Sequence, residues 1–253
     1  MASNDTQSNA WFGVAMFLFG LIAGAVLTFA TGTKSMFTNG GSVPTPSAPT
    51  APSQPTAPMA SAKARMTAYA EEVGVDTDKF TACLDSGKYK AKVSDQQAGG
   101  EKAGVSGTPG NVIVNMKTKK ARLISGARPF ASFQAEIDDL IANPSSDSKD
   151  PSVTAVTNLP AIDFAVDHYM GDKTAEIALV EYNDYQCPFC HRVHPTIKQV
   201  MEQYDGKVVW VLRHFPLYSI HPDAELMAAG AECAKELGGA DAFWEYTDKV
   251  MAE

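Results

Sequence analysis

The sequence predicts an α/β domain preceded by one membrane-spanning helix. Short apolar runs of strand length, such as 177–180, alternate with segments whose apolar residues recur at helical spacing, such as 191–204. Residues 11–30 carry no charge, and a helix of this length is about 30 Å long, which matches the hydrocarbon core of a bilayer. With 253 residues, of which 45% are apolar, the chain can build one medium domain with additional segments.

The N-terminal apolar run predicts an uncleaved anchor in preference to a cleaved signal peptide. The tail at 1–10 has no Lys or Arg, the run at 11–30 is longer than a usual signal core, and no clear A-x-A cleavage site follows it. The orientation of the anchor in the membrane is less well defined. The one basic residue nearby, Lys34, would by itself hold the C-terminal side in the cytoplasm, whereas disulfide chemistry needs that side in an oxidising compartment.

Two segments have the composition of linkers. Residues 31–62 are rich in Pro, Ser, Thr, Ala and Gly and predict a semi-extended tether after the anchor. Residues 143–159 contain the polar run PSSDSKDP and predict a second linker. The formal net charge of -8 and the absence of a basic cluster interleaved with aromatic residues argue against nucleic acid as a partner.

Helices and strands are predicted on both sides of the second linker. Before it, the pattern predicts helices at 64–74, 77–86, 88–103 and 130–142, and strands at 111–116 and 121–125. After it, the pattern predicts strands at 177–182 and 207–213, a helix that follows Cys187, a helix at 222–237 that Gly238 and Gly239 close, and a last helix from Asp241.

The motif CPFC, at 187–190, lies where the apolar run at 177–180 has ended and an amphipathic helix begins. A thiolate at a helix N-terminus faces unpaired backbone N–H groups and the positive end of the helix dipole, which lower its pKa. Pro188 suits the first helical turn, where a missing N–H costs nothing. The motif therefore predicts a disulfide between Cys187 and Cys190 that closes and reopens.

A zinc site is the alternative for CPFC. It requires a second pair of ligands at matching spacing, whereas Cys83 and Cys233 stand alone in the sequence. His191 and His194 are the residues that could complete such a site. The favoured interpretation needs neither a metal nor an organic cofactor.

These residues resemble the DsbA-like thiol–disulfide oxidoreductases, which have a thioredoxin fold with an inserted helical domain. VEYNDYQCPFC at 180–190 resembles the active-site strand and turn of the family, and RHFPL at 213–217 resembles the end of its next strand. The stretch from Cys233 to Tyr246 is similar to the first inserted helices, and FTACLDSGKY at 80–89 is similar to a later one. GTP at 107–109 resembles the loop that carries the cis-proline of the family.

The order of these pieces departs from the family. Residues 63–142 resemble the C-terminal half of the domain, yet they precede 160–253, which resemble its N-terminal half and carry CPFC. We expect a circular permutation in which 143–159 join the old termini, a change that folds tolerate when those termini lie close together. The alternative is that each half is completed by another chain.

The resemblance implies further site residues. Pro109, with the Thr108–Pro109 bond in cis, would lie opposite Cys187 and leave backbone groups free to pair with an extended substrate. On sequence alone, Pro109 is an ordinary turn proline between Gly107 and Gly110. Gly110 also departs from the bulkier apolar residue expected in the family. Pro188 and Phe189 are expected to tune the redox pair and contact substrate.

Glu181 resembles the buried acid of the family near the active site. Such a group would relay the proton of the inner thiol, Cys190, as mixed disulfides resolve. Alternation along the strand is equally consistent with a solvent-facing Glu181.

Cys83 and Cys233 are candidates for a structural disulfide. Cys233 shares a helical stripe with Leu226 and Leu237, and Cys83 shares one with Phe80, so both sulfurs are expected to point inward. In an oxidising compartment two apposed thiols close, and the bridge would join the two halves of the domain. The alternative is a pair of unconnected core cysteines.

The sequence therefore predicts a membrane-tethered, extracytoplasmic protein-disulfide oxidoreductase, with oxidase activity favoured over isomerase or reductase activity. Its expected substrates are cysteine-containing secreted or surface proteins, and a membrane redox partner would reset it. The hypothesis from another class is a non-catalytic membrane-tethered binding or scaffold protein that keeps the fold.

Overall fold

The computed structural model describes residues 61–252. The predicted anchor at 11–30 and nearly all of the predicted tether lie outside the described residues. Within the described range, no helix is both long enough and apolar enough to cross a membrane.

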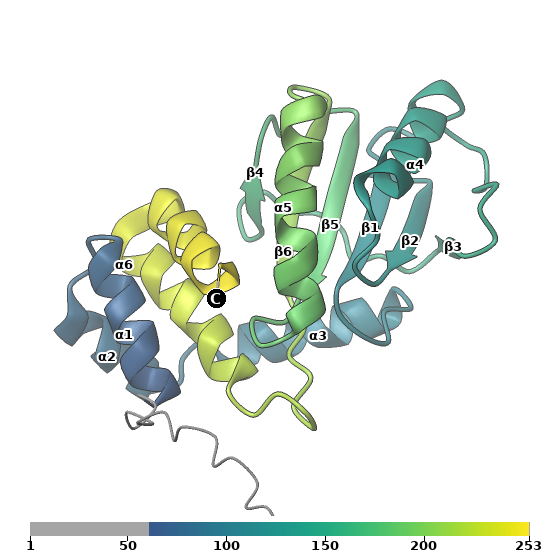
Figure 1. Ribbon diagram of the computed structural model, residues 1–253. Coiled ribbons are helices and arrows are strands. Elements are labelled where there is room, and N and C mark those ends of the chain that lie inside the picture. The colour runs from purple at the N-terminus through teal and green to yellow at the C-terminus, as the bar shows by residue number, and fades with distance from the viewer. Residues whose placement is uncertain (1–60, 253) are drawn as a thin grey trace, which may run out of the picture. The chain divides into compact units, whose positions relative to one another are not determined.

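Twelve helices and strands make up this part of the chain (Figure 1). In order they are α1 (Ala62–Glu72), α2 (Thr77–Ser86), α3 (Lys90–Lys102), β1 (Gly110–Asn115), β2 (Ala121–Ser125), α4 (Phe130–Ala142), β3 (Thr154–Val156), β4 (His168–Met170), β5 (Ile177–Asn183), α5 (Pro188–Gln203), β6 (Val208–His214) and α6 (Ala224–Met251). The predicted elements are confirmed to within a few residues. The short strands β3 and β4 were not predicted.

One six-stranded sheet in the order β3-β2-β1-β5-β6-β4 contains strands from both sides of 143–159. β5 and β6 run parallel, and every other pair is antiparallel. At the centre β1 pairs with β5, with Gly110 opposite Tyr182 and Val112 opposite Val180. The segments before and after the polar segment therefore complete each other within one sheet.

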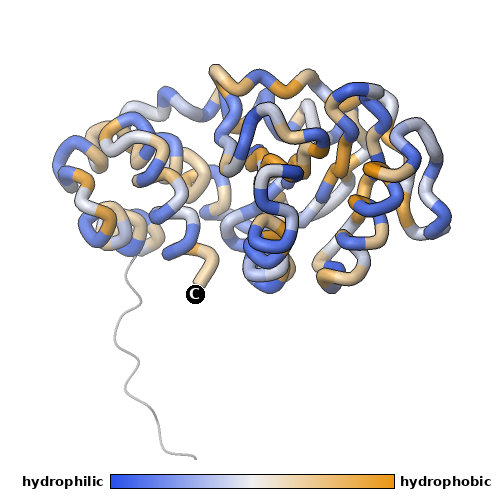
Figure 2. The backbone as a smooth tube through the Cα atoms, turned by 90° about the horizontal axis from the view of Figure 1, so that it is seen from above, coloured by the Kyte–Doolittle hydropathy of each residue, from blue (hydrophilic) through white to orange (hydrophobic). Residues whose placement is uncertain are grey.

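Helices α4 and α5 lie side by side against one face of this sheet, and α1 and α2 pack with α6 in a separate helical group (Figure 1). A core that includes Phe133, Ile197 and Trp210 fills the space between the sheet and these helices. A second core, with Val112 and Val180, lies on the opposite face. Figure 2 shows that the most hydrophobic stretches run through the strands, because both faces of the central strands are covered.

The middle of α6 confirms the break predicted at Gly238 and Gly239. Gly239 has φ 83° and ψ -168°, so the long α6 is two helical stretches joined at a kink. A residue with a side chain rarely adopts this conformation. The predicted helices before and after the two glycines therefore both exist, and the kink gives the second stretch a new direction.

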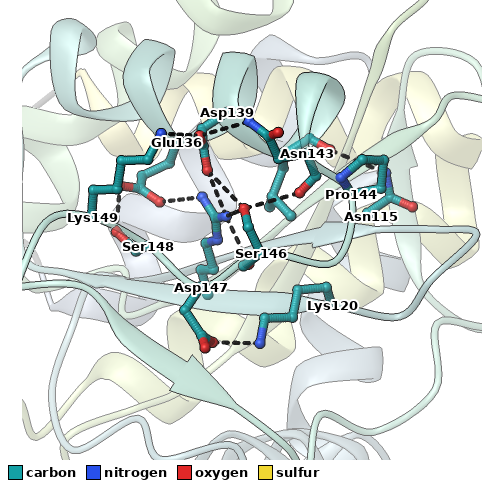
Figure 3. Close-up of polar contacts among 12 residues, drawn as sticks. Asn115, Lys120, Glu136, Asp139, Asn143, Pro144, Ser146, Asp147, Ser148 and Lys149 are labelled. Atoms are coloured by element: carbon teal, nitrogen blue, oxygen red, sulfur yellow. Dashed lines mark hydrogen bonds and ion pairs between the residues drawn. The ribbon is translucent and has the colours of Figure 1, made fainter.

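The polar segment 143–159 is bound to the sheet. Arg122 on β2 is buried and donates to Glu136 and Asp139 of α4, each at 2.8 Å, and to the Ser146 carbonyl, also at 2.8 Å. Figure 3 shows the polar side chains of Glu136, Asp139, Ser146 and Lys149 gathered around this contact. Downstream of it, β3 pairs with β2 at the sheet edge. The segment thus forms part of the folded structure, held by the hydrogen bonds of Arg122 to Ser146 and by the pairing of β3 with β2.

Candidate active site

Cys187 and Cys190 lie at the junction of β5 and α5. Cys187 is the N-cap residue of α5, and Pro188 is in its first turn. The Cys187 N–H donates to the Asp184 carbonyl at 3.0 Å, and the Cys190 N–H donates to the Cys187 carbonyl at 2.9 Å. Both thiols are free and buried, with 3% of Cys187 and 0% of Cys190 exposed.

The environment lowers the pKa of Cys187 to about 5. The main cause is a hydrogen bond from the Cys190 thiol, and the N–H groups of Phe189 and Cys190 add to it at the positive end of the helix. The protonated Cys187 thiol can donate to the Thr108 carbonyl oxygen, 3.4 Å away, and the thiolate cannot. The groups that donate to the sulfur outweigh this contact, and the low pKa favours the thiolate at neutral pH.

Cys190 has the opposite character. Burial raises the pKa of its thiol well above 9.0, and the hydrogen bond to Cys187 and the charge of Glu181 raise it further. The outer sulfur is thus the better nucleophile of the two, while the inner sulfur keeps its proton at neutral pH. This asymmetry is what sequential disulfide exchange requires.

Glu181 lies on β5, and its side chain is buried. Burial raises the pKa of its carboxyl group to about 8, although the Trp210 indole opposes the shift by donating to Oε2 at 3.0 Å. Oε1 has no hydrogen-bond partner among the described residues. The solvent-facing alternative is wrong because β5 is covered on both faces, so alternation along the strand does not distinguish inside from outside.

The loop before β1 contacts the turn at 184–190 that carries both cysteines, called the redox turn below. The Thr108–Pro109 bond is cis, and the Thr108 carbonyl oxygen is the backbone atom 3.4 Å from Cys187 Sγ. The cis bond and this contact favour the interpretation of Pro109 as a cis-proline beside Cys187 over that of an ordinary turn proline. Next to this contact, Pro188 and Phe189 are exposed, with 52% of Phe189 accessible to solvent. The structure thus gathers all the residues predicted for the redox site: Thr108, Pro109, Glu181, Cys187, Pro188, Phe189 and Cys190.

Cys83 and Cys233 form a disulfide, as predicted. It joins α2 to α6 across 150 residues of sequence, with a Cα–Cα distance of 5.9 Å. The alternative of two unconnected core cysteines is wrong.

His191 and His194, considered as ligands in the zinc alternative, have protein partners. The His191 ring contacts the Tyr185 carbonyl at 2.8 Å, and His194 pairs with Asp248 at 2.7 Å. A different group, His168, His214 and Glu232, brings three potential metal-ligand atoms within 4.8 Å of one another. However, the Lys92 ammonium donates to Glu232 Oε2 at 2.8 Å and lies 3.1 Å from His168 Nε2. The carboxylate of this group therefore already has a cationic partner.

Two site residues were not identified from the sequence. Trp210, on β6, supplies the donor to Glu181. Asp184, between β5 and α5, contacts both cysteines through its backbone. The signal that could have found Asp184 was an acidic residue three positions before Cys187 at the end of an apolar strand.

Comparisons with known proteins identify two parts of the chain. A family described as DSBA-like thioredoxin domain matches residues 56–138, and a family described as Thioredoxin matches residues 165–253. The strand and turn with CPFC lie in the second match, and the Thr108–Pro109 loop lies in the first.

Curated relatives match over a shorter length. The Na(+)/H(+) antiporter NhaA 3 of Salinispora tropica is 40% identical over 86 residues, which are 34% of this chain and 13% of the antiporter. NhaA 1 of Mycolicibacterium gilvum is 38% identical over 101 residues, or 40% of this chain and 16% of the antiporter. This chain thus spans only a small part of these relatives. The two family matches, the mixed sheet and the CPFC turn together support a thioredoxin-fold, DsbA-like protein.

Proposed function

We propose that this protein is a membrane-anchored thiol–disulfide oxidoreductase that acts on cysteines of extracytoplasmic proteins through Cys187 and Cys190. The observation that carries the proposal is the opposite pKa shift of the two thiols in one helical turn, lowered for Cys187 and raised for Cys190. The anchor is residues 11–30, and the support for it is their lack of charge over the length of a membrane span.

In the oxidising direction, a substrate thiolate attacks Cys187 Sγ of the closed Cys187–Cys190 disulfide. A new sulfur–sulfur bond forms, the old one breaks, and Cys190 leaves as a thiolate that takes up a proton. A second substrate thiolate then attacks the substrate sulfur of the mixed disulfide and releases Cys187 as a thiolate. The substrate loses two electrons, which the two cysteines gain.

Glu181 is suited to handle the proton of Cys190. Its raised pKa of about 8 lets it exist in both protonation states near neutral pH, and its charge acts on the Cys190 thiol. Substrate is proposed to lie along the Thr108–Pro109 loop, next to the exposed ring of Phe189. An extended peptide there would place its sulfur beside Cys187.

We also propose that the domain is a circular permutation of the DsbA-like fold. The support is that the segment similar to the family's C-terminal half comes first, yet its β1 pairs with β5 of the other half. The segment 143–159 would join the old termini, and Arg122 binds it against α4. Completion by another chain is not needed to form the central strand pair.

The test is to equilibrate the full chain, in detergent micelles, with defined glutathione ratios and to follow each cysteine by mass-resolved thiol labelling. A reduction potential of about -120 mV for the Cys187–Cys190 pair would identify an oxidase, and one of about -270 mV would identify a reductase. A folded chain whose Cys187–Cys190 pair does not exchange would refute the catalytic proposal and leave the binding protein.

A further inference from the structure

Asp184 is the residue that links the redox turn to the loop at 215–223. Its backbone N–H points at Cys190 Sγ, 3.5 Å away, and its carbonyl accepts from the Cys187 N–H at 3.0 Å. The residue is buried, with 1% exposed. Any shift of Asp184 therefore changes the surroundings of both sulfurs.

The carboxylate of Asp184 is held from two sides. Oδ1 accepts from the Gln186 N–H at 2.8 Å, within the redox turn itself. Oδ2 accepts from the Leu217 N–H at 2.8 Å and lies 2.7 Å from His221 Nδ1, both in the loop between β6 and α6. The Asp223 N–H adds a further link by donating to Gln186 Oε1 at 2.6 Å.

His221 is the side chain that pairs with this buried carboxylate. The Asp184 side chain is fully buried, whereas 15% of the His221 side chain is exposed. A buried carboxylate that loses a hydrogen-bond partner is costly to keep in place. The imidazole is therefore one of three groups that fix the position of Asp184, with the N–H groups of Gln186 and Leu217.

We propose that Asp184 and His221 form a positioning clamp that keeps the Asp184 N–H aimed at Cys190 Sγ and so stabilises the Cys190 thiolate during disulfide exchange. Neither residue touches substrate; both act through the backbone of the redox turn. The inference deepens the proposed function and rests on it for its biological use, because a Cys190 thiolate appears in each direction of exchange.

The step that the clamp assists is specific. When an external thiolate attacks Cys187 Sγ, a bond forms to that sulfur, the Cys187–Cys190 bond breaks, and the electron pair leaves on Cys190. A hydrogen bond to a charged sulfur is stronger than one to a neutral thiol, so the Asp184 N–H favours this leaving group more than the protonated product. Attack by Cys187 on another disulfide does not place charge on Cys190.

The test is reduction of the oxidised full-length protein by dithiothreitol, followed by acid quench and mass-resolved labelling. Because a hydrogen bond to a charged group is lost, H221A is expected to slow reduction of the Cys187–Cys190 bond by about tenfold. H221N, whose side-chain amide can replace the Nδ1 donor, is expected to restore most of the rate. D184N keeps a hydrogen-bond acceptor but loses the negative charge. This second variant weakens the contact with His221 from the other side and is expected to slow reduction as well.

The matched control is Y204F. The Tyr204 hydroxyl donates to the Asp138 carboxylate at 2.7 Å, and Tyr204 is the C-cap residue of α5, at the opposite end of that helix from the redox turn. Its loss is expected to lower the melting temperature without slowing reduction. Equal slowing in Y204F and H221A, or an unchanged rate in both H221A and D184N, would overturn the clamp.

A second readout separates the two sulfurs. In a C190S background, adding H221A is expected to change the rate of Cys187 alkylation by less than about twofold, since the leaving group is gone. A parallel loss of Cys187 reactivity would overturn the assignment to Cys190. Dithiothreitol reduces the pair even if no polypeptide substrate is accepted, so failure of the proposed function would appear as wild-type reduction by dithiothreitol without exchange with cysteine peptides.

Discussion

The two cysteine pairs of this protein differ in where each sulfur lies along a helix. Cys187 is the N-cap of α5 and faces backbone N–H groups, whereas Cys83 lies near the C-terminal end of α2 and Cys233 lies inside α6. Glu236 Oε2 is 3.9 Å from Cys83 Sγ, which adds negative charge there. A thiolate is thus stabilised at Cys187 and disfavoured at Cys83. Helix position and charge separate the exchanging pair from the structural one.

The largest effect should come from C187S. Without the outer sulfur no mixed disulfide forms, so exchange with cysteine peptides is expected to fall to the rate of a cysteine-free control. C233A, in contrast, should leave exchange measurable. Mass-resolved labelling kinetics on both variants measure this difference in exchange rate. Loss of exchange in a folded C233A variant would contradict the prediction.

Removal of the structural disulfide should affect stability. The bridge spans 150 residues, and the chain-entropy estimate for its loss is on the order of 3–5 kcal/mol of unfolding free energy. The double variant C83A/C233A avoids leaving a free thiol. Chemical denaturation of this variant measures the loss, and C187A/C190A in the reduced protein is the matched control, expected to change stability less because those two thiols are not bonded to each other. An equal loss in both would contradict the assigned roles.

The pH profile of alkylation sharpens the comparison within the redox turn. Cys187 should react with iodoacetamide with a midpoint near pH 5, while Cys190 stays unreactive at neutral pH. Because the Cys190 thiol is the main cause of the low pKa of Cys187, C190A should move the midpoint upward. An unchanged midpoint in C190A would assign the shift to the helix N-terminus alone.

The effect of E181Q on stability depends on pH and is expected to be smallest at low pH. The carboxyl group has a pKa of about 8 when folded and 4.5 as its ordinary value, so between these values the folded state binds more protons than the unfolded state. Stability from this group is therefore complete below pH 4.5 and is lost as pH rises toward 8, by up to about 1.4 kcal/mol per pH unit. E181Q should flatten this slope. Denaturation at several pH values tests it, and an identical slope in both proteins would show that folding does not raise the pKa of Glu181.

Much of the fold could be predicted from local pattern. The apolar runs that became β5 and β6 and the helix start at Pro188 have signals within a few residues, so their predicted limits agree with the structure. The strands β3 and β4 have only three residues each, and they form because a neighbouring strand edge is available. Such pairing has no local signature.

The site divides in the same way. The CPFC turn is a local motif, and its chemistry follows from the helix end. The position of Glu181 depends on a strand covered on both faces, and the Asp184–His221 contact joins residues 37 positions apart. Contacts of this kind depend on tertiary packing, so the residue pattern alone could not supply them.

The pairing of β1 with β5 has a consequence for synthesis. β1 and β2 are synthesised before β5, so the edge of β1 that pairs with β5 has no partner until 177–183 have followed. An unpaired strand edge is a template for aggregation, so we expect the nascent chain to be most prone to aggregation during this interval. Cys187 follows β5 by only a few residues, and the Thr108 loop has been synthesised by then. The partner loop of the reactive thiol is therefore available as soon as the thiol appears.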